Sequence, residues 1–157
     1  MWFGNLVTVQ WWTHLWLKEG FASYLQYLSV DAIFPEWKVW DRMIVSAYTT
    51  ARSLDSLRSS HPVEVPVENP GAINEIFDTI SYLKGCSIIR MLYSWLGPDA
   101  MRRGLSQYLK KYSYGAASTE ILWAELEDVS GEPVESVMSL WTGQMGFPLL
   151  EIEKKRK

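Results

Sequence analysis

Apolar residues recur at three- and four-residue spacing along most of the chain, and this spacing is typical of one face of an α-helix. Between residues 13 and 32, one such apolar stripe consists of Leu17, Phe21, Tyr24, Leu25 and Leu28. No stretch alternates apolar and polar residues for long enough to predict the strands of a core sheet. The hydrophobic pattern therefore predicts a mainly α fold, whose first helix covers about residues 13–32.

Proline residues mark the next boundaries along the chain. Pro35 can occupy the first turn of a second helix that extends to about residue 57. The segment 61–71 contains three prolines and a short Val-Glu-Val-Pro-Val alternation, so it predicts an extended loop or a brief edge strand. A short helix is expected at about residues 73–77.

The second half of the chain predicts further helices. One covers about residues 82–96 and ends at Gly97, and Pro98 then begins another that extends to about residue 112. Two more are expected at about residues 118–129, where Ser118 is a suitable N-cap, and at about 133–144.

The last apolar run, residues 149–152, follows the helix-breaking sequence Gly-Phe-Pro. Its composition predicts an orphan β-strand at the C-terminus, whose partners lie outside the chain. The expected organisation is thus a helical array with one strand at its end.

Composition indicates a globular protein without affinity for nucleic acid. The 157 residues fit one ordinary domain, and 48% of them are hydrophobic, which excludes a disordered or fibrous chain. The net charge of -3 supplies no positive field for phosphates, so we expect no nucleic acid partner. The basic end, residues 154–157, is typical of a solvated tail.

A single cysteine, Cys86, excludes an internal disulfide and a thiolate-based zinc cluster. It favours a reducing compartment, so we expect a cytoplasmic location. No apolar run approaches the roughly twenty residues that a transmembrane helix needs. We therefore expect no membrane-spanning segment in this chain.

Glu19 is an unexpected acid within the aromatic and aliphatic stretch WWTHLWLKEGFASYLQYL, residues 11–28. An unpaired buried carboxylate costs on the order of several kcal/mol, so such a group either reaches water or is held for chemistry. A catalytic metal site needs about three protein ligands, and the only histidines are His14 and His61. His14 and Glu19 lie about 140° apart around a helix and do not converge. The residues alone therefore predict no complete active site.

Four stretches, spread in order over almost the whole chain, resemble segments of one enzyme family. They are WFGNLVT (residues 2–8), the stretch at 11–28, EIFDTISYLKGCSIIRML (75–92) and WTGQMGFPLL (141–150). Together they resemble the gluzincin-type zinc aminopeptidases, of the puromycin-sensitive and alanyl aminopeptidase kind. The resemblance implies the helical C-terminal part of a thermolysin-like catalytic domain over residues 1–147, and the start of a following β domain over 148–157.

The resemblance also implies roles for two residues. In this family, zinc is held by two histidines of an H-E-x-x-H helix and by a glutamate in a segment usually written N-E-G-F-A. The segment K-E-G-F-A corresponds to it, so Glu19 matches the third zinc ligand, while Lys18 stands where asparagine is usual. Tyr82, in S-Y-L-K-G, matches the tyrosine that hydrogen-bonds the oxyanion of the tetrahedral intermediate. His14 matches no ligand and is expected to be structural.

The H-E-x-x-H motif itself is absent, because its second histidine would fall immediately before residue 1. Two zinc ligands and the glutamate that activates water are therefore missing, as is the upstream G-x-M-E-N segment that holds the substrate's amino terminus. The resemblance implies a zinc metalloaminopeptidase that removes N-terminal residues from peptides. This chain alone is expected neither to hold zinc nor to be active.

Two other functions stay open at this point. The chain could be a truncated, non-catalytic fragment that acts as a protein-binding module, because apolar surface bared beside the missing helix would favour association. It could also be half of a split enzyme whose partner chain supplies H-E-x-x-H. Zinc binding and activity on mixing would indicate the split enzyme, whereas a complex with neither would indicate the binding module.

Overall fold

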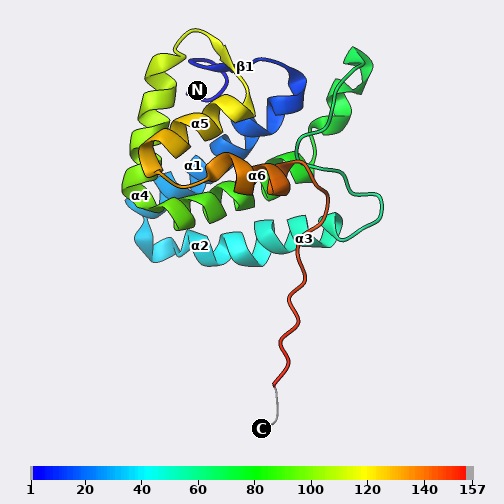
Figure 1. Cartoon of the computed structure of the whole chain (residues 1–157). Helices are drawn as coiled ribbons and strands as arrows, with labels where there is room; N and C mark the ends of the chain where they lie inside the picture. The colour runs from blue at the N-terminus through cyan, green and yellow to red at the C-terminus, as the bar shows by residue number, and fades with distance from the viewer. Residues whose placement is uncertain (1, 155–157) are drawn as a thin grey trace.

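Helices dominate the computed structural model, which describes residues 2–154 (Figure 1). The two longest, α1 and α4, pack against each other, and α4 also packs against α5. The α-helices are α1 (Leu15–Ile33), α2 (Val39–Arg42), α3 (Thr49–Asp55), α4 (Gly85–Lys111), α5 (Thr119–Ser130) and α6 (Val134–Thr142). The mainly α fold predicted from the hydrophobic pattern is confirmed.

Several short turns of other helix types join these elements. Three are 3₁₀ turns, η1 (Trp12–His14), η2 (Pro35–Trp37) and η4 (Pro70–Ile76), and two are π-helical turns, η3 (Met43–Tyr48) and η5 (Ile80–Lys84). The predicted second helix is therefore divided. Pro35 begins only the turn η2, because Lys38 adopts a left-handed conformation with φ 47° before α2 begins. From Val39 to Asp55 the chain is helical throughout.

Helix α4 contains the break that the sequence predicted. Gly97 has φ 80° and ψ 163°, which is not helical, and Pro98 follows it directly. The two predicted helices are therefore present within α4, on either side of Gly97. None of the helices within residues 2–154 is both long enough and apolar enough to span a membrane.

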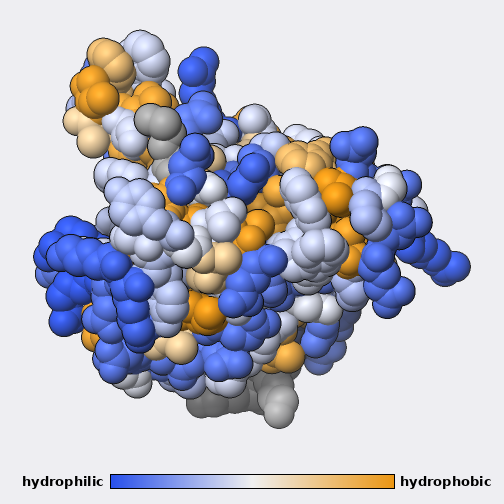
Figure 2. Space-filling view, turned by 90° about the horizontal axis from the view of Figure 1, so that it is seen from above, coloured by the Kyte–Doolittle hydropathy of each residue, from blue (hydrophilic) through white to orange (hydrophobic). Residues whose placement is uncertain are grey.

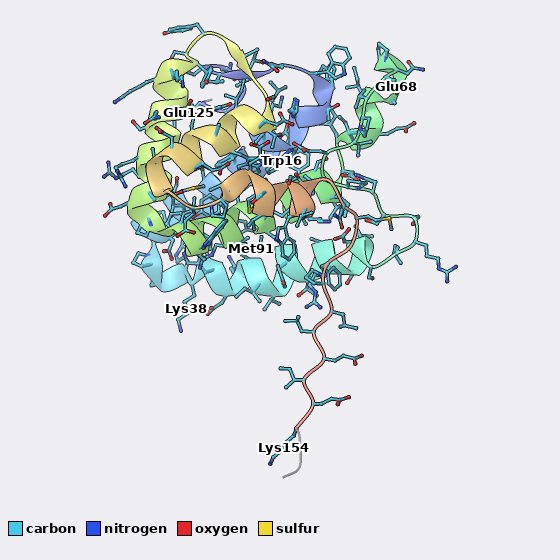
Figure 3. All side chains as sticks on the ribbon, viewed as in Figure 1. Trp16, Lys38, Glu68, Met91, Glu125 and Lys154 are labelled. Atoms are coloured by element: carbon cyan, nitrogen blue, oxygen red, sulfur yellow. The ribbon has the colours of Figure 1, made fainter. Side chains whose placement is uncertain are left out.

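The core is built around the first turns of α1. Trp16 lies at the centre of the body (Figure 3), where its ring packs 5.9 Å from that of Trp123 on α5. On the same helix Phe21 stacks on Phe3 with ring centroids 4.3 Å apart, and both Trp16 and Phe21 are fully buried. Burying side chains of this size stabilises the fold by about 2–3 kcal/mol each. Helix α1 therefore has packing partners on more than one of its faces.

Two very short strands form the only sheet among the described residues. β1 (Thr8–Val9) pairs in parallel with β2 (Ala116–Ala117), with Thr8 opposite Ala116. The backbone N–H of Gln10 extends the contact by donating to the carbonyl oxygen of Ala117 at 3.0 Å. This pairing holds the N-terminal segment against the loop that leads into α5.

The predicted C-terminal strand does not form. Residues 147–154 have no regular structure and lead away from the helical body (Figure 1). Leu149 and Ile152 are 80% and 95% exposed, since a strand is stable only when its N–H and C=O groups pair with another strand. Of the predicted basic tail, Lys154 lies far out on this segment (Figure 3), and residues 155–157 lie outside the described part.

Candidate active site

Two glycines allow α1 to cross the start of α4 at backbone contact distance. A Cβ atom added to Gly20 would lie 3.1 Å from the carbonyl carbon of Gly85 and 3.1 Å from Cδ1 of Ile89. Contacts this short require the absence of a side chain on Gly20. The crossing therefore brings the residues that flank the two glycines, Glu19 and Tyr82 among them, close together.

The two residues that the sequence singled out are neighbours across this crossing. Burial and the adjacent Glu19 carboxylate together raise the pKa of the Tyr82 phenol above its ordinary value. Tyr82 is half-buried, and the Glu19 side chain is 15% exposed. The phenol therefore keeps its proton at neutral pH and is available as a hydrogen-bond donor.

Tyr82 lies within the π-helical turn η5, which is fixed at its start by Asp78. The Asp78 carboxylate accepts a hydrogen bond from the backbone N–H of Ser81 at 2.9 Å. The backbone N–H of Tyr82 donates to the Asp78 carbonyl oxygen at 3.1 Å. At the end of the turn, the N–H of Gly85 bonds the carbonyl oxygen of Ile80, five residues earlier. The backbone that carries the Tyr82 side chain is thus bonded at both ends.

Glu19 is lightly paired by comparison with other acids of the chain. Its ion pair within residues 2–154 is with Nζ of Lys18 at 3.4 Å, and the Lys18 side chain is 37% exposed. A carboxylate with spare acceptor capacity suits a metal ligand. The residues described do not bring three or more His, Cys, Asp or Glu side chains together as a metal site. Glu19 fits one ligand of a zinc site and not the whole set.

Both histidines are engaged away from Glu19. Nδ1 of His14 lies 2.9 Å from the hydroxyl of Thr119, at the start of α5. His61 has Nδ1 2.7 Å from the Pro62 carbonyl oxygen and Nε2 2.6 Å from the Asp78 carboxylate. These contacts give each histidine a role in holding loops and helix ends, as expected for His14.

A buried cluster around Glu64 was not indicated by the sequence pattern. Trp16 Nε1 donates to one Glu64 oxygen at 3.0 Å, and the Thr142 hydroxyl donates to the other at 3.3 Å. Burial alone would raise the pKa of Glu64, but hydrogen bonds from His14, Thr119 and Trp16 outweigh burial and lower it. The partners are 48 and 78 residues away in sequence, so no local spacing could have identified them.

A second buried cluster joins Asp55, at the end of α3, to Lys84, at the end of η5. Lys84 Nζ lies 2.8 Å from the Asp55 carboxylate, and both side chains are less than a tenth exposed. Lys84 Nζ also donates to the carbonyl oxygens of Gln144 and Gly146 at 3.2 and 3.1 Å. The other Asp55 oxygen accepts from the Ser60 hydroxyl at 2.8 Å and from the Gly146 N–H at 2.9 Å. This pair has no signal in the sequence beyond the resemblance of the S-Y-L-K-G segment.

Comparison with known proteins gives a family match over most of the chain. Residues 1–141 match the Peptidase family M1 domain. This chain belongs to the M1 peptidase family. Its relatives include Aminopeptidase M1-D of Oryza sativa subsp. japonica, which is 53% identical over 154 residues, or 98% of this chain. Aminopeptidase 2, mitochondrial, of Saccharomyces cerevisiae is 52% identical over 98% of the chain, and Aminopeptidase M1 of Arabidopsis thaliana is 52% identical over 98%.

The M1 match confirms the resemblance on which the expectations for zinc and peptide chemistry rest. The family is one of zinc-dependent metalloaminopeptidases. The chain spans only 18%, 16% and 17% of the length of the three relatives named above. What the whole protein does is therefore a matter for proposal, as are the roles of Glu19 and Tyr82.

Proposed function

We propose that this chain forms the downstream part of a zinc aminopeptidase catalytic domain, over residues 1–147, and that residues 148–157 begin a following β domain. The observation that carries the proposal is that α1 packs against η5 beside the Gly20–Gly85 crossing, with Glu19 near enough to the Tyr82 phenol to raise its pKa. These two residues are 63 positions apart in the sequence and lie close together in the fold. They are the two residues that the resemblance to the family matches to a metal ligand and to an oxyanion donor. Packing unrelated to function would not be expected to bring these two residues together.

Glu19 would contribute one carboxylate oxygen to the zinc. Zinc, when bound in such a site, polarises a carbonyl group and lowers the pKa of water. The crossing of α1 holds Glu19 at a half-buried position where the Lys18 ammonium is its near charge. Lys18 can therefore orient the carboxylate in the absence of a cation, and its side chain is 37% exposed, which gives the ammonium group access to water.

Tyr82 would donate its phenolic hydrogen to the oxyanion that develops on the peptide carbonyl during attack by water. Such a donor accelerates the reaction because it binds the charge of the transition state more strongly than the neutral substrate. The raised pKa of Tyr82 suits this role, since a phenolate could not donate. The substrate is a peptide with a free amino terminus.

The other two ligands and the general base would come from polypeptide outside these 157 residues, which contain no H-E-x-x-H motif. We infer that the chain by itself neither holds zinc nor cleaves peptides, because one carboxylate binds zinc too weakly. We also propose a cytoplasmic location, which the single free cysteine, Cys86, supports.

The test is a graft of this chain into Aminopeptidase M1 of Arabidopsis thaliana in place of the matching segment. We expect the graft to hydrolyse an aminoacyl-4-nitroanilide. Tyr82→Phe should lower kcat about 10²–10³-fold with KM little changed, because only the transition state uses the hydroxyl. Tyr93→Phe is the matched control, since Tyr93 is also a half-buried tyrosine, on α4. An unchanged kcat for Tyr82→Phe would remove the assignment.

The alternative function is binding of another protein through exposed apolar surface, and one observation favours it. Trp37 is 54% exposed and Val45 is 75% exposed. The face seen in Figure 2, on the side of the molecule away from α2, carries hydrophobic patches among hydrophilic ones. Such surface can bind another protein. Sedimentation of the chain alone and with the H-E-x-x-H segment of a relative separates the possibilities. A complex without zinc would favour a binding module, and a complex with zinc and activity would favour a split enzyme.

A further inference from the structure

The turn that carries Tyr82 ends in a charge that is buried and completely paired. Lys84 is the last residue of η5 and is 6% exposed. Its ammonium group has three donors, and three oxygens face it, from Asp55 at 2.8 Å, Gln144 at 3.2 Å and Gly146 at 3.1 Å. No proton of Lys84 is left free to adopt another arrangement.

Asp55 is paired as fully as Lys84. One of its oxygens faces the ammonium group, and the other accepts hydrogen bonds from Ser60 and from the Gly146 backbone. Burial by itself would raise the pKa of Asp55, but these bonds outweigh burial and lower it. The pair therefore fastens the end of η5 to α3 and to the segment after α6.

We propose that the Asp55–Lys84 pair is a positioning device for Tyr82, fixing the π-helical turn so that the phenol faces Glu19. The proposal rests on the proposed function, in which Tyr82 meets the oxyanion. It names Asp55 and Lys84 as positioning residues, because both side chains are less than a tenth exposed and their polar atoms bond to the protein.

The hydrogen bonds of η5 show how a displacement of Lys84 would reach Tyr82. The N–H of Gly85, the residue after Lys84, bonds the carbonyl oxygens of Ile80 and Tyr82. A π-helical turn carries one residue more than an α-helical turn, and it persists only where surrounding contacts maintain it. If the Lys84 anchor is released, the turn can relax toward α-helical bonding. The Tyr82 side chain would then rotate around the helix axis, away from Glu19.

Stability alone is a weak reason for such a pair. The desolvation of two charges offsets most of their attraction, and well-packed apolar residues of similar size often stabilise a fold as well or better. A fully paired buried ion pair instead favours one specific arrangement of the surrounding backbone, because every other arrangement leaves a buried charge unpaired. The pair lies next to the residue whose placement decides the oxyanion contact, and this location favours the positioning role.

The experiment compares Asp55→Asn with Glu125→Gln. Both changes keep the shape of a buried carboxylate and remove its charge, and each carboxylate pairs with a lysine, Lys84 at 2.8 Å or Lys111 at 2.5 Å. The Glu125 pair joins α5 to the end of α4, away from η5. The Lys111 side chain is 59% exposed, so Glu125→Gln controls for the loss of charge on a buried carboxylate that pairs with a lysine.

The first readout is amide hydrogen exchange in this chain. We expect Asp55→Asn to speed exchange at residues 80–84 by at least about tenfold relative to Leu92 in α4, because the turn opens locally once its anchor is weakened. Glu125→Gln should leave that ratio unchanged. Equal effects of the two variants on residues 80–84 would overturn the proposal. If Asp55→Asn does not fold, Ser60→Ala removes one bond to Asp55 and takes its place.

The second readout is kinetic, in the Arabidopsis graft described above. Asp55→Asn should lower kcat about tenfold to a hundredfold with little change in KM, as expected when a catalytic group is misplaced. Glu125→Gln should keep kcat. If Tyr82→Phe has normal kcat, the proposed function fails, while the exchange experiment still decides whether the pair fixes the turn. If Tyr82→Phe is impaired and Asp55→Asn is normal in both readouts, only the positioning proposal fails.

Discussion

Glu19 belongs to α1 and Glu64 bonds Trp16 of the same helix, and the two acids are paired very differently. Glu64 accepts hydrogen bonds on both oxygens, from Trp16 and Thr142, and His14 lies 3.6 Å away. Glu19 has the partly exposed Lys18 ammonium at 3.4 Å as its ion pair among the described residues. Helix α1 therefore contacts Glu64, whose two oxygens both accept hydrogen bonds, and carries Glu19, which has fewer partners.

The difference in pairing agrees with the different roles that we propose for the two acids. A buried carboxylate is tolerated when its oxygens are all bonded, and its removal then leaves several donors unpaired. A metal ligand needs the opposite, an oxygen that the protein orients without occupying. Glu64 meets the first description, and the second is the role that we propose for Glu19.

The largest expected effect is on the free energy of unfolding, and it comes from substitution of Glu64. Glu64→Ala should lower the free energy of unfolding of the chain by about 3 kcal/mol, because buried donors of Trp16 and Thr142 lose their acceptor. Glu19→Ala should change it by no more than about 0.5 kcal/mol, since its ion pair is partly exposed. Urea unfolding at neutral pH measures both. Similar costs for the two variants would abolish the distinction between the two acids.

Lowering the pH should also distinguish the two acids, through a smaller change in the free energy of unfolding. The pKa of Glu64 is lowered in the folded chain, so the unfolded state binds more protons as the pH falls. The stability contributed by Glu64 is present above its ordinary carboxyl pKa of about 4.3 and is lost as the pH falls through the folded value.

Urea midpoints at pH 7 and pH 4 measure this loss. Glu64→Gln should lose less stability between the two pH values than the unaltered chain, although Asp55 and Glu125, whose pKa values are also lowered, titrate in both. An identical loss in the two proteins would mean that Glu64 is not held as an anion.

Local patterns in the sequence were sufficient for the helices. The helix expected at about residues 118–129 is α5, Thr119–Ser130, and the predicted break at Gly97 is present. Such features depend on periodicity and on residues a few positions apart. The two π-helical turns were not foreseen, because a single extra residue in a turn leaves the apolar spacing almost unchanged.

The long-range polar contacts could not be predicted from the sequence, and the reason is different. Glu64 lies in the proline-rich segment that was expected to be an extended loop or a brief edge strand, and Val63 and Val67 of the same segment are buried. Which distant donors converge on a carboxylate depends on how the helices pack, and no local spacing encodes that packing. Glu19 and Tyr82 were identified only by resemblance to a family. The glycines that allow them to meet, Gly20 and Gly85, belong to the same segments.

The most direct test of Glu19 as a metal ligand is the zinc content of the Arabidopsis graft, measured by elemental analysis after dialysis. The graft should hold zinc, and Glu19→Ala should lose it while staying folded, because a carboxylate ligand is gone and little stability depends on it. Glu120→Ala, at an exposed acid of α5, is the control and should keep its zinc. Retention of stoichiometric zinc by Glu19→Ala would contradict the assignment of Glu19 and, with it, the distinction drawn between the two acids.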